Sequence, residues 1–304
     1  MRRFVFAALC ALFCLSLASP ARAADTLTAS RTFTFGDLRV AKYGNGPQTL
    51  IFIPGLACGP WEWQAEIARL APRYRIYALT LPGFDGLAST AKRPLFADVS
   101  AEFWALLARE HIVKPILIGH SLGGTLAFDL AEQHPHRLRA IVSVDGLPIF
   151  PGNERITPTQ RKANATRMIA SLATMTHAQF ETSERTMVLP YLTISPTTAA
   201  LLAPLVARSS PRATGAWAGE DATIDLRPQL ARATLPILLV APYDATTEAS
   251  FAPNAAAVAD YYRTLVPGAA RLQIVTIDRS RHFIMYDRPN ALATTLQSFL
   301  GSPQ

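Results

Sequence analysis

The segment Gly119-His120-Ser121-Leu122-Gly123 constrains the fold of this chain more than any other stretch. The apolar run 115–118 before it is typical of a short buried strand. Residues 124–133 after it are typical of a helix, because leucines recur there at four-residue spacing, and Pro135 ends that helix. A Gly-x-Ser-x-Gly pattern between a strand and a helix predicts a sharp, strained turn that exposes the serine hydroxyl above the sheet. We therefore interpret Ser121 as a candidate nucleophile.

Strand and helix patterns alternate along most of the chain. Buried strand patterns occupy 49–53, 75–79, 139–144, 235–240 and 271–277, and a hairpin pattern occupies 32–43. Strands that alternate with helices predict a parallel sheet covered by helices on both faces. The chain has 304 residues, half of them hydrophobic, and is therefore long enough to bury a large core. The sequence favours an α/β fold.

Residues 148–233 interrupt this alternation. The segment is rich in Thr, Ala and Pro, has several helical patterns and contains no convincing buried strand. No polar linker marks its edges, so we expect one domain, 24–304, with its core in 24–147 and 234–304. We predict that 148–233 is a helical cap, inserted after the sixth strand over the carboxyl ends of the strands.

The first 23 residues are typical of a cleavable secretory signal peptide. Arg2 and Arg3 precede an apolar run at 4–17, and the small-x-small sequence Ala21-Arg22-Ala23 follows. The apolar run is short for a membrane span of about 20 residues. We therefore expect cleavage after Ala23, no stable membrane insertion afterwards, and a secreted or periplasmic mature protein.

Composition narrows the classes of partner. The formal net charge of +7 falls to about +4 when the arginines of the predicted signal peptide are removed. No run of Lys or Arg forms a patch that would follow a phosphate backbone, so we predict no nucleic-acid partner. Cys58 is the one cysteine outside the predicted signal peptide, which excludes an intramolecular disulfide and favours a small buried side chain.

A serine hydroxyl is a weak nucleophile at neutral pH and needs a base within hydrogen-bond reach. His282 lies in a loop at the carboxyl end of the last predicted strand, at the sheet edge where Ser121 is expected. The other histidines lie in the elbow, at helix ends or in the predicted cap: His120, His111, His134, His136 and His177. We therefore predict His282 as the general base.

The acid that orients this base is expected between the serine and the histidine in the chain. Asp244 follows the strand pattern that ends at 240, and we predict that its carboxylate holds the imidazole of His282. Asp145, at the end of the strand after the elbow helix, is the alternative, although an Asp-Gly pair is also typical of a turn. Glu248 ranks third.

An oxyanion formed during acyl transfer needs preorganised hydrogen-bond donors. One is the backbone N–H of the residue after the serine, here Leu122, and another comes from the loop after the third strand. We assign the second donor to the backbone N–H of Leu56.

These motifs resemble the α/β-hydrolase superfamily over essentially the whole mature chain. Gly119–Gly123 resembles its nucleophile elbow, 81–84 its loop after the fourth strand, and Arg281-His282-Phe283 its Gly-His-Phe/Trp. Pro54-Gly55-Leu56 stands where many members have His-Gly. The resemblance implies a mostly parallel, twisted sheet of about eight strands, flanked by helices and carrying a helical cap.

The predicted function is a secreted serine hydrolase that cleaves a carboxylic ester, or a related acyl bond, through an acyl-enzyme on Ser121. The serine argues against the dehalogenases and epoxide hydrolases of the fold, because those use an aspartate nucleophile. The alternatives are an aminopeptidase, perhydrolase or carbon–carbon bond hydrolase of the same fold, or a non-catalytic binding protein. An aminopeptidase would use acidic cap residues to hold the substrate ammonium: Glu181, Glu184, Glu220 and Asp221.

The expected partner is a small-molecule acyl substrate, whose identity the sequence leaves open together with the oligomeric state. A mostly apolar pocket is predicted from Trp61, Trp63, Phe180, Met187, Leu189, Tyr191, Leu192, Leu201, Leu202 and Trp217. The sequence has no His-Glu-x-x-His spacing and no dinucleotide fingerprint, so we expect no metal and no cofactor.

Overall fold

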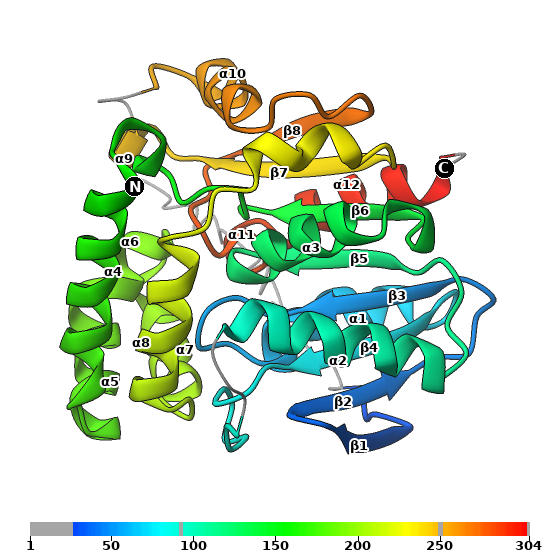
Figure 1. The fold of residues 1–304 in the computed structure, drawn as a ribbon, viewed down its shortest axis with the longest axis horizontal. Coiled ribbons are helices and arrows are strands. Elements are labelled where there is room, and N and C mark those ends of the chain that lie inside the picture. The colour runs from blue at the N-terminus through cyan, green and yellow to red at the C-terminus, as the bar shows by residue number, and fades with distance from the viewer. Residues whose placement is uncertain (1–26, 91–93, 249–251, 303–304) are drawn as a thin grey trace, which may run out of the picture.

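A computed structural model describes residues 27–90, 94–248 and 252–302, and an eight-stranded sheet lies at its centre (Figure 1). The strand order is β1-β2-β4-β3-β5-β6-β7-β8. The strands are β1 (Arg31–Phe35), β2 (Leu38–Tyr43), β3 (Thr49–Ile53), β4 (Arg75–Thr80), β5 (Ile116–His120), β6 (Ala140–Val144), β7 (Ile237–Tyr243) and β8 (Leu272–Asp278). The predicted signal peptide, 1–23, lies outside the described residues.

The sheet is mostly parallel. β1 and β2 form the expected antiparallel hairpin, β2 pairs antiparallel with β4, and the pairings from β3–β4 to β7–β8 are parallel. In β3, Leu50 and Phe52 pack into one hydrophobic core and Ile51 and Ile53 into another, because successive side chains point to opposite faces. A strand buried on both faces explains why its sequence is an uninterrupted apolar run. The predicted α/β fold with about eight strands is confirmed.

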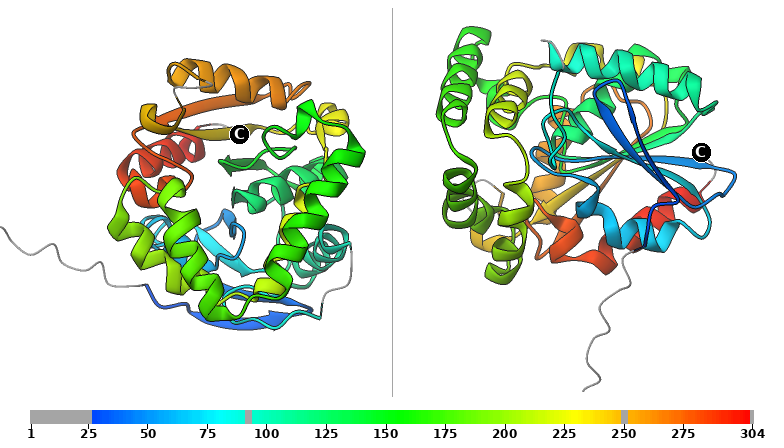
Figure 2. Two further views of the ribbon diagram at one scale, coloured as in Figure 1. Left: turned by 90° about the vertical axis from the view of Figure 1, so that its left-hand side faces the viewer. Right: turned by 90° about the horizontal axis from the view of Figure 1, so that it is seen from below.

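Helices cover both faces of the sheet (Figures 1 and 2). One core includes side chains from α2 (Leu95–Arg109), α3 (Leu122–Gln133) and α10 (Ala255–Leu265). The other includes side chains from α1 (Gln64–Leu70), α11 (Ile284–Asp287) and α12 (Pro289–Gly301). Short 3-10 turns lie at Pro60–Trp63, Pro135–Arg137, Asn153–Arg155 and Arg227–Arg232, and α9 (Ala245–Glu248) follows β7. Among the described residues, no helix is long and apolar enough to cross a membrane.

Helix α2 begins at Leu95, where a contact from a distant segment satisfies its first backbone N–H groups. The Glu220 carboxylate, far away in the chain, accepts hydrogen bonds from the backbone N–H groups of Leu95 and Phe96 at 2.7 and 2.9 Å. A carboxylate at this end satisfies N–H groups that have no intrahelical partner and also complements the helix dipole.

Between β6 and β7 the chain forms α4 (Pro158–Ala173), α5 (His177–Ser183), a π-helical turn (Glu184–Val188), α6 (Leu189–Leu192), α7 (Pro196–Val206) and α8 (Pro211–Asp221). We call α4 to α8 the cap. Figure 1 shows the cap as a layer at one end of the sheet. The chain enters the cap from the end of β6, so this is the carboxyl end of the parallel strands. Local signals start two of its helices, because Thr157 and Thr176 each form a capping box with the glutamine three residues later.

Candidate active site

Ser121 lies on a strained turn between β5 and α3. Its backbone angles are φ 51° and ψ −120°, a region that residues other than glycine rarely adopt. The flanking glycines are required by space. A Cβ at Gly119 would lie 2.1 Å from the carbonyl oxygen of Gly123, and one at Gly123 would lie 2.4 Å from that of Ile53. The sequence pattern therefore forms the predicted tight turn because the chain packs against itself and against β3 at backbone distance.

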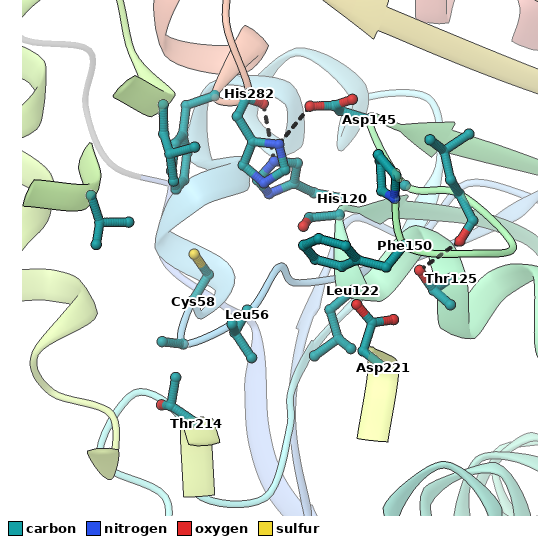
Figure 3. Close-up of a pocket in the computed structure, with 18 of the residues that line it drawn as sticks. Leu56, Cys58, His120, Leu122, Thr125, Asp145, Phe150, Thr214, Asp221 and His282 are labelled. Atoms are coloured by element: carbon teal, nitrogen blue, oxygen red, sulfur yellow. Dashed lines mark hydrogen bonds and ion pairs between the residues drawn. The ribbon is translucent and has the colours of Figure 1, made fainter. Parts of the chain in front are cut away.

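His282 contacts Asp145. The imidazole Nδ1 lies 2.5 Å from Asp145 Oδ2 (Figure 3), and the Tyr262 hydroxyl donates to Asp145 Oδ1 at 2.5 Å. The two carboxylate oxygens thus have separate partners, so the carboxylate is held in a fixed orientation toward the ring. A carboxylate on Nδ1 leaves Nε2 as the nitrogen that can accept a proton from a nucleophile.

Asp244, the residue predicted to orient His282, has a different partner, and this preference is corrected. Its Oδ2 accepts from Arg281 Nε at 2.6 Å and from the Thr246 hydroxyl at 2.7 Å, and its Oδ1 accepts from the Thr246 backbone N–H at 3.1 Å. Burial alone would raise the pKa of Asp244, but hydrogen bonds from Thr246 and Arg281 and the charge of Arg281 lower it. Asp145, the alternative that the sequence also indicates, lies beside His282 Nδ1 in its place.

Arg281 explains why Asp145, and not Asp244, contacts His282. Besides Asp244, its guanidinium donates to the cap carbonyl oxygens of Pro190 and Thr193 at 2.8 and 3.1 Å. Asp244 therefore helps to fasten the cap to the loop that carries His282. In the sequence, Arg281 directly precedes His282, and this position is the signal that the arginine would pair with a carboxylate near the base.

The predicted oxyanion donors, Leu56 and Leu122, both line one cavity with Ser121 and His282. Leu122 is the first residue of α3, so its N–H belongs to the helix end whose donors have no intrahelical acceptor. Among the described residues, no hydrogen bond to the N–H of Leu56 or Leu122 is found. Both groups are therefore free to donate to a bound oxygen.

The cavity has a volume of about 400 Å³ and lies between the strand ends and the cap. Polar side chains in its wall, apart from those described above, are His120, Thr125, Thr214, Glu184 and Asp221. The apolar wall is formed by Ala57, Cys58, Leu147, Ile149, Phe150, Pro151, Val188, Leu189, Leu192, Val206 and Phe283. A mostly apolar cavity of this size accommodates a small ligand.

Of the apolar residues predicted for the pocket, Leu189 and Leu192 line the cavity. Trp217 is buried instead and donates its indole N–H to the carbonyl of Pro82 at 3.1 Å. Met187, Tyr191 and Leu201 are exposed, with relative accessibilities of 68%, 71% and 57%. Apolar composition of the cap did not distinguish side chains that face the cavity from those that face the core or the solvent. Cys58 is 1% exposed, as expected, and burial raises the pKa of its thiol.

The sequence pattern of the alpha/beta hydrolase family matches residues 50–295. The chain belongs to this family. Similarity in structure agrees with the assignment of the fold. A thermophilic esterase from Thermogutta terrifontis superimposes with a TM-score of 0.70 at 17% identity, over 90% of this chain and 97% of that one. The enol-lactonase from Burkholderia xenovorans LB400 gives a TM-score of 0.70 at 16% identity, over 90% and 100% of the two chains.

Similarity in sequence to individual relatives is more local. A pimeloyl-[acyl-carrier protein] methyl ester esterase from Aeromonas hydrophila is 32% identical over 114 residues, which is 36% of this chain and 42% of that protein. A putative carbamate hydrolase RutD from Yersinia enterocolitica is 27% identical over 109 residues, 36% and 39% of the two chains. The match thus spans about two fifths of the length of these relatives.

A buried pair behind the active site of this hydrolase was not predicted from the sequence. Glu62 and His120 are 2% and 1% exposed, and Glu62 Oε2 lies 3.1 Å from His120 Nδ1. Glu62 Oε1 accepts from the Gly55 N–H at 3.0 Å, and His120 Nε2 lies 3.1 Å from the carbonyl oxygen of His282. The pair thus connects the oxyanion loop to the backbone of the predicted base.

The protons of this pair can be placed by their partners. A carbonyl oxygen only accepts, so His120 Nε2 carries a proton. A further proton must lie between His120 Nδ1 and Glu62, because two acceptors without a proton would repel each other at hydrogen-bond distance. The pair is therefore either an imidazolium with a carboxylate or a neutral imidazole with a carboxylic acid.

Replacing Glu62 with alanine is expected to lower kcat by about 10- to 100-fold, because small displacements of reacting groups are costly. Glu62→Gln is the matched control. Its amide can accept from Gly55 and donate to a neutral His120, so we expect a loss of less than about tenfold. Steady-state kinetics and the melting temperature of both variants check this. An alanine variant as active as the unmodified enzyme would show that Glu62 does not position the site.

The acidic cap residues fall into two groups. Glu181 pairs with Arg185, and Glu220 binds the start of α2, so neither is available to a ligand in the cavity. Glu184 and Asp221 do line the cavity, and burial raises the pKa of each carboxyl to about 7.

Proposed function

We propose that this alpha/beta hydrolase is a serine hydrolase that cleaves a carboxylic ester. The observation that carries the proposal is the 2.5 Å contact of His282 Nδ1 with Asp145, in a cavity that also contains the strained Ser121. A nucleophile, a base and an acid behind the base are the three parts that serine-based acyl transfer requires. The similar Aeromonas protein is named as a methyl ester esterase, which supports the same substrate class.

In the first step, Ser121 Oγ attacks the carbonyl carbon of the ester and its proton passes to His282 Nε2. Asp145 stabilises the resulting imidazolium through Nδ1 and keeps the ring in the tautomer that presents Nε2. The carbonyl oxygen becomes an oxyanion and accepts from the N–H groups of Leu56 and Leu122. Each such donor is worth about 3 kcal/mol in the transition state.

Collapse of this intermediate breaks the bond to the alkoxy oxygen, which leaves as the alcohol with the proton from His282. The acyl group then remains on Ser121. A water molecule gives a proton to His282 and attacks the acyl carbon, and the second collapse releases the carboxylic acid and restores the Ser121 hydroxyl. The reaction consumes one water and needs no other reactant.

We also propose that the protein is exported, on the basis of the sequence at 1–23. Amino-terminal sequencing of the protein from its native host is expected to begin at Ala24. Finding the intact amino terminus in the cytosol would contradict export without affecting the proposed chemistry.

The proposed function is tested with the purified mature chain. A fluorophosphonate probe is expected to label one serine, identified as Ser121 by peptide mass spectrometry, and p-nitrophenyl acetate and butyrate are expected to be hydrolysed. A folded protein that is not labelled and turns over neither ester would overturn the proposal. Hydrolysis of prolyl naphthylamide faster than either ester would favour the aminopeptidase alternative instead.

A further inference from the structure

Helix α8 of the cap presents two polar side chains to the cavity that contains Ser121. Thr214 and Asp221 both line it, and both are labelled in the close-up of the cavity in Figure 3. They are seven residues apart, which is close to two turns, so they lie on the same face of the helix. One helix face therefore supplies a polar strip, Thr214 and Asp221, to a mostly apolar cavity.

Both side chains have buried polar atoms that find no hydrogen-bond partner within the part of the chain that the structure describes. Thr214 is 2% exposed, and no hydrogen-bond partner of its hydroxyl oxygen is found among the described residues. Asp221 Oδ1 is likewise buried, and no partner for it is found in the same part of the chain. Leaving a buried polar group unpaired typically costs stability, so two such groups on one cavity wall require an explanation.

The hydroxyl of Thr125 does not provide the missing partner of Asp221. Thr125 also lines the cavity, but its hydroxyl proton is donated to the carbonyl oxygen of Leu147 at 2.9 Å. A hydroxyl has one proton, so Thr125 offers Asp221 only lone pairs. A molecule in the cavity can supply the donor that Asp221 Oδ1 lacks.

We propose that the polar strip of α8 binds a hydroxyl group on the part of the ester that is remote from the scissile carbonyl. This inference rests on the proposed function and narrows its substrate class to hydroxylated esters. A hydroxyl can donate to Asp221 and, in another pose or at a second position, exchange a hydrogen bond with Thr214. Unpaired polar groups in a pocket discriminate strongly against analogues that lack the matching group.

A neutral partner fits this wall better than an ammonium group. Burial raises the pKa of the Asp221 carboxyl to about 7, so the cavity already disfavours the charged form of its own side chain. Bringing a second charge into the same apolar surroundings would add another desolvation penalty. A hydroxyl forms the missing hydrogen bond without that penalty.

The test compares matched ester pairs that differ by one hydroxyl. For the acyl side, the pairs are p-nitrophenyl 3-hydroxybutyrate with butyrate, and 6-hydroxyhexanoate with hexanoate. For the alcohol side, 4-hydroxybutyl butyrate is compared with butyl butyrate. In at least one pair we expect kcat/KM to be about tenfold higher for the hydroxylated ester, equivalent to about 1.4 kcal/mol.

Two variants locate this preference. Asp221→Leu is expected to reduce the ratio to about one or below and to raise kcat/KM for the plain ester, because the wall becomes apolar. The nearly isosteric Thr214→Val is expected to reduce the ratio severalfold, and it carries the test if the leucine variant does not fold. Thr223→Ala, exposed and just beyond α8, is the control and should keep the ratio.

Stability separates a binding role from a structural one. Removing an unpaired buried group is expected to leave the melting temperature of Thr214→Val unchanged or higher, whereas loss of a structural contact would lower it. A ratio near one for every pair in the unmodified enzyme, with ordinary ester hydrolysis and labelling intact, would overturn this inference alone. So would an Asp221-dependent preference for 6-aminohexanoate over 6-hydroxyhexanoate. Absence of both labelling and ester hydrolysis would overturn the proposed function and this inference with it.

Discussion

Replacing Ser121 with alanine is expected to lower kcat/KM for p-nitrophenyl butyrate by about 10⁴- to 10⁶-fold and to abolish fluorophosphonate labelling. The loss is large because the base and the acid have no task without the nucleophile. The oxyanion donors Leu56 and Leu122 remain, so a small residual rate over the uncatalysed reaction is expected. Ser302→Ala, an exposed serine near the carboxyl terminus, is the matched control and should keep full activity.

The backbone of Ser121 adds a second readout to this experiment. Its φ of 51° and ψ of −120° are costly for any residue with a Cβ, and alanine does not relieve them. Ser121→Gly should therefore be as inactive as the alanine variant but more stable than it, by about 1 kcal/mol or more in the free energy of unfolding. Substantial esterase activity in either variant, or no gain in stability from glycine, would contradict this reading of the elbow.

The second large effect is expected from Asp145→Asn. The amide keeps the shape of the side chain, but it presents its NH2 or a neutral oxygen to His282 Nδ1 and no longer stabilises an imidazolium. For this change in a comparable arrangement of groups kcat falls by about 10⁴-fold, and we expect a loss of about 10²- to 10⁴-fold. Tyr262, which donates to the other oxygen, can still bind the asparagine carbonyl, so the fold should be retained.

Asp244→Asn is the matched control, because the same atoms change at the acid that the sequence had favoured. We expect kcat to fall by less than about tenfold. The free energy of unfolding should fall by about 1–3 kcal/mol, because the charge-assisted hydrogen bond from Arg281 is weakened. Measuring kcat and the unfolding curve of both variants separates the two roles. A large loss of kcat in Asp244→Asn with little loss in Asp145→Asn would reverse the assignment.

The sequence pattern alone does not decide whether Asp145 or Asp244 orients His282. Both aspartates directly follow neighbouring parallel strands, β6 and β7, so local pattern places both at the same sheet edge. What separates them is a set of long-range contacts. Arg281 forms an ion pair with Asp244, whereas Tyr262 on α10 donates to Asp145 and holds that carboxylate toward the imidazole.

The sequence pattern alone does not decide the pocket or the buried pair either. Glu62 and His120 are fifty-eight residues apart and meet behind the oxyanion loop, which no spacing in the sequence indicates. In the cap, local capping residues start two of the helices, but which face of each helix meets the cavity is not a local property. That depends on how α8 packs over the strand ends, and it decides that Thr214 and Asp221 lie in the wall.

The sequence by itself determined the α/β class, the parallel sheet, and the turn that carries Ser121. Those features depend on apolar periodicity and on glycines that allow backbones to approach, and both are local properties of the chain. Only the tertiary structure decided which carboxylate orients His282, which buried pair supports the oxyanion loop, and which polar groups face the cavity. Several residues were chemically able to fill each of these positions, and the choice among them was made by packing between segments distant in the chain.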